Sequence, residues 1–138
     1  MKRAPRTRAL PSVLGPWFLF ALYHIFVFES LLRPTTELPV LPFSIDDKVA
    51  HFVEFCLLFW VSYYAFRLQF RRPANRVIVR SAWLWSVCAG ALTEYLQTFV
   101  PDRRCDPWDL FADAIGAAAG AIVLRFVLIF FGQRQKKP

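Results

Sequence analysis

Charged residues are scarce in this 138-residue chain, at 20% of positions, while 57% of its residues are hydrophobic and 17% are aromatic. An ordinary soluble domain carries about 25% charged residues. A chain this apolar is not intrinsically disordered, and the absence of an internal repeat excludes a solenoid or a collagen. The length favours a single domain over residues 1–138. Composition therefore leaves two classes, a soluble helical domain and a small integral membrane protein.

Cysteines are also few, and the short motifs of several common sites are missing. The three cysteines form no CxxC pair, so neither a disulfide framework nor a cysteine-based zinc site is expected. Neither HExxH nor GxSxG occurs in the chain. These patterns assign no metal site, and they leave the cofactor unknown.

Long hydrophobic stretches separate clusters of basic residues. Ala9–Phe28 contains no formally charged residue and, at 20 residues, is long enough to cross a bilayer. The later hydrophobic runs reach that length only if each includes acidic residues at one end. With prolines marking the connections, the sequence predicts an all-α integral membrane protein, a bundle of four membrane-spanning helices. The predicted spans are Pro11–Leu32, Val49–Phe66, Val77–Val100 and Asp109–Phe131.

Lysine and arginine are distributed unevenly among the connections and tails. Twelve of the 17 lie in the N-terminal tail, the connection at 67–80 and the C-terminal tail, whereas four lie in the other two connections. The positive-inside rule then places both termini in the cytoplasm, with basic tails at 1–10 and 132–138. Topology and attraction to anionic lipid account for the net charge of +7, so no nucleic-acid partner is expected.

Acidic and other polar residues gather at the predicted outer ends of the second, third and fourth spans. Asp47, His51 and Glu54 share one helix face, because they are spaced i, i+4, i+7. A charge facing lipid at that depth would cost about 2.5–3.5 kcal/mol or more. The three helices are therefore expected to turn their polar residues toward one another. The later spans carry pairs three or four residues apart: Glu94 with Gln97, and Asp109 with Asp113.

Small residues follow the polar residues along the same helices. In the third predicted span they are Ala82, Ser86 and Gly90, and in the fourth Gly116 and Gly120 form a GxxxG pair. Such faces let helix backbones approach closely in membranes. The sequence therefore predicts that these faces pack against neighbouring helices.

The ordered set of polar and small residues resembles the VanZ-like membrane proteins. Within residues 46–121 it comprises Asp47-Lys48-x-x-His51-Phe52, Glu94-x-x-Gln97, Pro101-x-Arg103, Asp106, Asp109 and Gly116-x-x-x-Gly120. The resemblance implies a multi-pass protein of the bacterial cytoplasmic (inner) membrane with a role in envelope or antibiotic response, since the family's name member is associated with teicoplanin resistance. The chain departs from the family at Asp113, where the family usually has Asn, and this adds an acid to the cluster.

Three hypotheses for the polar residues stay open. In the first, they bind a membrane lipid or another envelope component, including a lipid-tailed glycopeptide, from the outer leaflet. Arg103 and Arg104 would then meet a phosphate or a carboxylate, because guanidinium groups suit both. The ligand-binding residues in this hypothesis are Asp47, Lys48, His51, Glu94, Gln97, Arg103, Asp106, Asp109 and Asp113.

In the second hypothesis the same residues form an active site for a lipid-phosphate type of substrate. The catalytic candidates are His51, Glu94 and Asp109, which together with Glu54 would act by general acid–base chemistry or hold a divalent metal. In the third hypothesis the residues form a satisfied network of ion pairs and hydrogen bonds that locks three helices together. The sequence predicts no oligomeric state.

Overall fold

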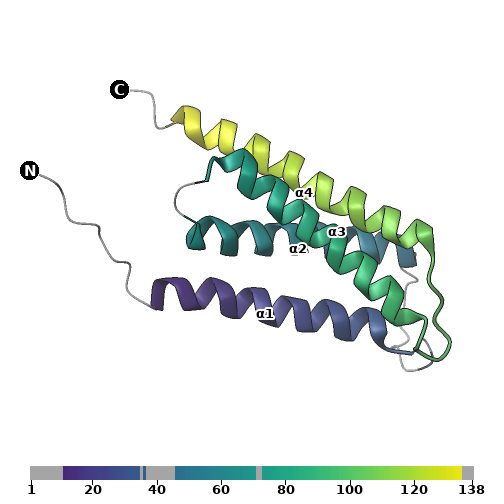
Figure 1. The fold of residues 1–138 in the computed structure, drawn as a ribbon. Helices are drawn as coiled ribbons and strands as arrows, with labels where there is room; N and C mark the ends of the chain where they lie inside the picture. Colours follow the sequence, from purple (N-terminus) through teal and green to yellow (C-terminus); the bar gives the residue numbers. More distant parts are fainter. Residues whose placement is uncertain (1–10, 35, 37–45, 71–72, 135–138) are drawn as a thin grey trace, which may run out of the picture.

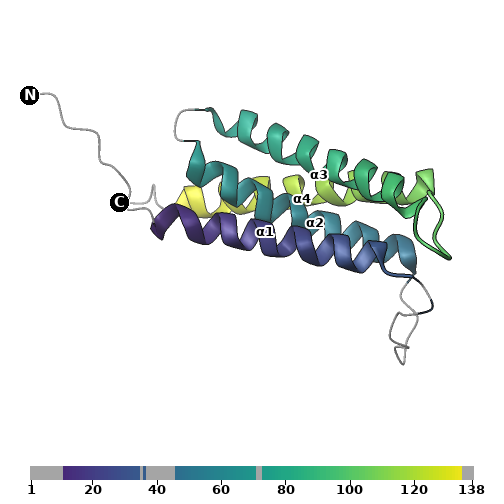
Figure 2. The same cartoon turned by 60° about the horizontal axis from the view of Figure 1, so that its bottom comes forward.

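The computed structural model describes residues 11–34, 36, 46–70 and 73–134. These residues form four helices and no strand, which confirms the predicted all-helical class. The helices lie side by side in an elongated bundle, and α1 begins at the end of the bundle where α4 finishes (Figures 1 and 2). The predicted basic tail at 1–10 and the last four residues of the tail at 132–138 lie outside the described residues. The helices are α1 (Pro11–Leu32), α2 (Asp47–Gln69), α3 (Asn75–Gln97) and α4 (Pro107–Arg134).

Aspartates set the starts of two helices slightly earlier than hydrophobicity predicts. The Asp46 carboxylate accepts the backbone N–H of Lys48 at 2.9 Å, so α2 begins at Asp47. The Asp106 carboxylate likewise accepts the backbone N–H of Trp108 at 2.9 Å, and α4 begins at Pro107. An aspartate N-cap satisfies a free N–H of the first turn, and proline suits the first helical position.

Three helices are long and apolar enough to cross a membrane: Leu14–Leu32 of α1, all of α2, and Pro107–Phe131 of α4. The prediction of spanning helices is confirmed for these three by length and composition. The helix α3 falls outside the group because Arg76, Arg80 and Glu94 make it less apolar. It nevertheless runs along the bundle beside the others, and it contacts α1, α2 and α4 (Figures 1 and 2).

The exterior of the bundle is apolar and part of its interior is polar. Phe18 and Phe126 are 71% and 68% exposed, whereas His51 and Asp113 are fully buried. A soluble bundle would bury its phenylalanines and expose its charges. This inverted arrangement suits a protein surrounded by lipid, where polar side chains face the bundle interior.

Glycines of α4 allow that helix to approach α2 closely. A Cβ added at Gly116 would overlap the carbonyl oxygen of Phe52 and lie 2.9 Å from its carbonyl carbon. A Cβ at Gly120 would lie 2.9 Å from the carbonyl oxygen of Cys56. The predicted GxxxG face is therefore confirmed, and its partner is α2.

Candidate functional site

The nine predicted ligand-binding residues gather at the end of the bundle where α2 and α4 begin and α3 finishes (Figure 1). We call this set the polar cluster. It has a buried part, the floor, in which no residue is more than 2% exposed. Its outer part, the rim, surrounds the starts of α2 and α4. The floor consists of His51, Glu94, Gln97 and Asp113, and the rim consists of Asp47, Lys48, Arg103, Asp106 and Asp109.

A histidine and an aspartate form the centre of the floor. Nδ1 of His51 lies 2.9 Å from Oδ1 of Asp113, and both side chains are fully buried. Because a carboxylate only accepts, the ring donates its Nδ1–H to Asp113. The other ring nitrogen, Nε2, has no hydrogen-bond partner among the described residues, and neither does Oδ2 of Asp113. Gly90 makes room for this carboxylate, since a Cβ there would lie 2.5 Å from Oδ2.

Glu94 connects the end of α3 to the start of α4. Its Oε2 accepts the backbone N–H of Asp106 at 2.8 Å, whereas its Oε1 has no partner in the part of the chain that the structure describes. Among the described residues, no lysine or arginine forms an ion pair with this carboxylate. Glu94 is therefore a buried acid with a hydrogen bond to only one of its two carboxylate oxygens among the described residues.

Lys48 links the rim of α2 to the start of α4. Its ammonium group donates to Oδ2 of Asp106 at 3.1 Å and to Oδ1 of Asp109 at 2.9 Å. The Trp108 N–H and, after it, the Lys48 ammonium lower the pKa of Asp106 below its usual value. One cation thus pairs with two rim acids and offsets one of their two negative charges.

Gln97 and Arg103 bind the end of α1 and its following residues. The Gln97 amide donates to the carbonyl oxygen of Leu31 at 3.1 Å, and Nε of Arg103 donates to that of Arg33 at 3.1 Å. Nη1 of Arg103 also lies 3.7 Å from Oδ1 of Asp47, and the arginine side chain is only 8% exposed. The described contacts of Arg103 thus lie within the chain, and its predicted contact with an anionic ligand stays a prediction.

Two hydroxyl residues of α1 that no sequence pattern predicted, Tyr23 and Ser30, contact Glu54 of α2. Ser30 donates its hydroxyl to Oε1 of Glu54 at 2.6 Å, and the Tyr23 hydroxyl donates to the Glu54 backbone carbonyl at 3.0 Å. Lone hydroxyl residues in an apolar helix give no spacing signal, so only the structure reveals these contacts. Oε2 of Glu54 is left without a partner among the described residues.

An apolar groove lies beside the rim, between α2 and α4, with a cavity volume of about 360 Å³. Lys48 belongs to both the rim and the groove. The large side chains of α4 in the groove are open to the surroundings, since Trp108 is 66% and Phe111 is 55% exposed. The groove is lined by Lys48, Val49, Phe52, Trp108, Phe111, Ala112 and Ile115.

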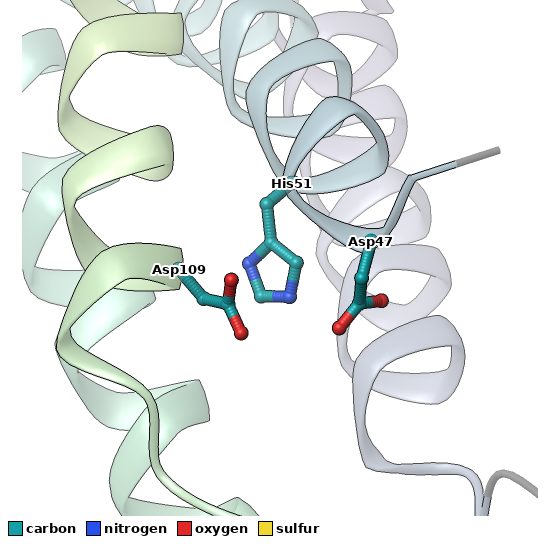
Figure 3. A group of neighbouring side chains, drawn as sticks. All are labelled: Asp47, His51 and Asp109. Atoms are coloured by element: carbon teal, nitrogen blue, oxygen red, sulfur yellow. The ribbon is translucent and has the colours of Figure 1, made fainter.

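Two overlapping sets of side chains have the composition of metal ligands and lie close enough together to hold an ion after small movements. In the first, a ring nitrogen of His51 and one oxygen each of Asp47 and Asp109 lie within 4.8 Å of one another. Figure 3 shows the His51 ring between these two carboxylates. The second set combines His51 with Glu94 and Asp113 at the same spacing limit. The short metal motifs are missing from the sequence, and the second hypothesis placed a divalent metal at His51, Glu94 and Asp109. In the structure Asp47 and His51 come from α2, whereas the other potential ligands come from α3 and α4.

Comparisons with known proteins agree with the motif resemblance. The family model described as VanZ/LLP1 matches residues 12–130. An uncharacterized protein of Schizosaccharomyces pombe is 34% identical over 85 residues, which cover 62% of this chain and 50% of that protein. The chain thus spans about half the length of the curated relative it matches. No solved structure matches the chain. The family expectation is confirmed, and the chain belongs to the VanZ/LLP1 family.

Proposed function

We propose that this chain is a four-span protein of the bacterial inner membrane whose polar cluster faces the outer leaflet and binds an amphiphilic envelope component. The bound molecule is a membrane lipid or a lipid-tailed glycopeptide, and the role is in envelope or antibiotic (teicoplanin) response. The observation that carries the proposal is the position of Lys48, which contacts the rim acids and also lines the apolar groove.

The groove and the rim together match the two halves of an amphiphile. An acyl chain would lie along Phe52 and Ile115 in the groove, where van der Waals packing would provide the attraction, because a chain that comes from the bilayer is already out of water. The polar head would then lie at Lys48, beside the rim. Trp108 suits the boundary between the two, since tryptophan favours membrane–water interfaces.

The rim favours a head group that donates hydrogen bonds. Asp47 and Asp106 are 58% and 39% exposed, and both offer carboxylate oxygens. The ammonium group of Lys48 is already paired with two acids. Hydroxyl and ammonium groups, such as those of sugars and amino sugars, therefore fit the rim better than a phosphate does.

The bundle geometry supports the proposed topology. The helix α1 begins at the end of the bundle where α4 finishes (Figure 1). A chain that crosses the membrane once with each helix would therefore cross it twice in each direction. The helix α3 runs beside α2 and α4, which are both long enough to span a membrane. It leads from the end of α2 to the start of α4, at opposite ends of the bundle (Figure 1). The lysine and arginine bias then orients the polar cluster outward.

A binding assay with one fluorescent lipid-tailed glycopeptide, with and without its acyl tail, tests the proposal. We expect saturable binding of the tailed form to the purified protein in nanodiscs, and at least tenfold weaker binding of the tail-free form. Filling the groove with Ala112→Trp should weaken binding of the tailed form by at least about tenfold, or about 1.4 kcal/mol.

Ala121→Trp is the matched control, because Ala121 lies in a different groove between α3 and α4. It should change the affinity less than twofold. Equal weakening by both variants, or no saturable binding by the wild type, would contradict the proposed function.

Catalysis on a lipid-phosphate type of substrate is the second candidate function. It is supported by the ligand-like spacing around His51, whose Nε2 has no partner among the described residues. Phosphate release from a lipid phosphate by the wild type, lost in His51→Asn, would establish it. A purely structural network is less favoured, since such a network would pair Glu94 Oε1 and Asp113 Oδ2.

A further inference from the structure

We propose that Asp47, His51 and Asp109 bind one divalent transition-metal ion of the Zn²⁺ or Mn²⁺ class, and that Asp113 positions the histidine. The inference rests on the proposed function in one respect, the use of the same rim. Its test needs no amphiphile, so the two proposals can fail separately.

The spacing of the three side chains suits one ion. Ligand atoms about 2.1 Å from a shared ion lie about 3–4 Å apart. The atoms of Asp47, His51 and Asp109 lie within 4.8 Å of one another, and their side chains converge in Figure 3. Small rotations of the two aspartates would bring all three into coordination distance.

The hydrogen bond between His51 and Asp113 prepares the histidine to bind a metal. Metal-binding histidines almost always donate their other ring N–H to a carboxylate or carbonyl, which sets the tautomer and the ring orientation. Here Nδ1 is bonded to Asp113 at 2.9 Å, so Nε2 is the nitrogen left for a ligand. This Nε2 is buried and without a partner among the described residues, a costly state that a metal ion would relieve.

The charges also agree with a divalent cation. The polar cluster holds five carboxylates against two cations, Lys48 and Arg103, which pair with Asp109 and Asp47, so a formal excess of negative charge remains for a divalent ion. Two carboxylates and an imidazole form a donor set that suits zinc or manganese. Lys48 does not prevent coordination. Its ammonium group is shared with Asp106 and contacts only Oδ1 of Asp109, so the other oxygen of Asp109 is left to bind the ion. Asp47 is 58% exposed, which leaves one side of the ion open to water or to an oxygen of the head group.

The alternative set, His51 with Glu94 and Asp113, shares the same histidine. This set is less favoured because two of its members already form hydrogen bonds. Asp113 accepts the Nδ1–H of His51, and one oxygen of Glu94 accepts the backbone N–H of Asp106. Substitutions of Asp47 and Glu94 separate the two sets.

Metal content of the full chain is the test. Protein purified in mild detergent would be stripped with EDTA, loaded with Zn²⁺ or Mn²⁺ alone, and dialysed. Elemental analysis should give one ion per chain for the wild type. His51→Asn and Asp109→Asn should lose stoichiometric metal, and Asp47→Asn should weaken binding at least tenfold in competition with a chromophoric chelator.

Glu54→Gln is the matched control, since Glu54 is also an acid of α2 with an unpartnered buried oxygen but belongs to neither set. It should keep one ion per chain. Asp113→Asn should raise the metal Kd about 10–100-fold while leaving the elution volume and helical content of the metal-free protein unchanged. That combination distinguishes a positioning role from a structural one.

Absence of saturable metal binding by the wild type would overturn the inference. So would full metal content in Asp47→Asn and Asp109→Asn, or loss of metal in Glu94→Gln with retention in Asp47→Asn. Glycopeptide binding measured in EDTA reports on the proposed function alone. A wild type that binds the tailed probe in EDTA but takes up no metal on reloading would therefore contradict only the metal site.

Discussion

His51 of α2 and Asp113 of α4 meet at 2.9 Å in the bundle interior, less than one turn from the point where Gly116 lies against the backbone of Phe52. The two contacts depend on each other. The side chains reach one another because α2 and α4 approach closely, and a glycine makes that approach possible. The small-residue face of α4 therefore positions the centre of the polar cluster.

Gly116→Ala should destabilise the protein, because its Cβ would overlap the carbonyl oxygen of Phe52 and force α2 and α4 apart. We expect the free energy of unfolding, measured by SDS titration in mixed micelles, to fall by about 1–3 kcal/mol or more. Gly15→Ala is the control, since a Cβ there meets nothing within 4 Å, and it should change stability by less than about 0.5 kcal/mol. Equal stability of the two variants would disprove the close packing.

Glu94→Gln should melt at or above the wild-type temperature in metal-free detergent solution. Glutamine keeps the acceptor for the Asp106 N–H and removes a buried charge that no lysine or arginine among the described residues balances. We expect a gain of about 1 kcal/mol, within the range for an unsatisfied buried group. A melting temperature well below that of the wild type would show that Glu94 has a charged partner and would favour the structural network.

Asp106 should make stability depend on acid pH. Its pKa is lowered in the folded protein, so the carboxylate stabilises the fold above its unfolded pKa of about 3.9. This contribution is lost as the pH falls through the still lower folded pKa. The melting temperature of the wild type should therefore drop more steeply below about pH 4 than that of Asp106→Asn.

Asparagine can still cap α4 but cannot pair with Lys48 as an anion, so at pH 7 Asp106→Asn should melt below the wild type. Other carboxylates titrate in both proteins and cancel in the comparison. Parallel melting curves over the whole pH range would contradict the assigned role of this carboxylate.

Cys105 offers a direct test of the proposed orientation. It is a free, exposed cysteine between α3 and α4, whereas Cys56 and Cys88 lie within α2 and α3. In intact bacterial cells, a membrane-impermeant maleimide should label the wild-type protein and should not label the Cys105→Ser variant. A cysteine placed at Ala74 in the Cys105→Ser background should react only after permeabilisation. The reverse pattern would place the termini outside.

The sequence predicted those parts of the fold that local patterns encode. The first helix begins and ends at the predicted residues, Pro11 and Leu32, because hydrophobic length and the following polar residues define it. The starts of α2 and α4 each fall two residues before the predicted starts, Val49 and Asp109, because aspartate caps extend these helices beyond their hydrophobic runs. Periodicity alone correctly placed the small-residue face of α4.

The candidate site could be predicted as a set of residues but not as a set of contacts. Helical spacing shows that His51 and Asp113 each face inward, yet it carries no information on which atom of one meets which atom of the other. The pairing of Arg103 with the Arg33 carbonyl joins residues 70 positions apart. Such contacts depend on the rotation and height of each helix in the bundle.

The sequence by itself determined four helices, a lipid-compatible exterior and the gathering of acids at one end of the bundle, since each follows from local hydrophobicity and the 3.6-residue helical repeat. Only the tertiary structure decided that Lys48 pairs with two rim acids and that Nε2 of His51 is left without a partner among the described residues. The physical reason is that hydrogen bonds between helices need atoms about 3 Å apart. Helix packing decides such distances, and spacing along one helix does not.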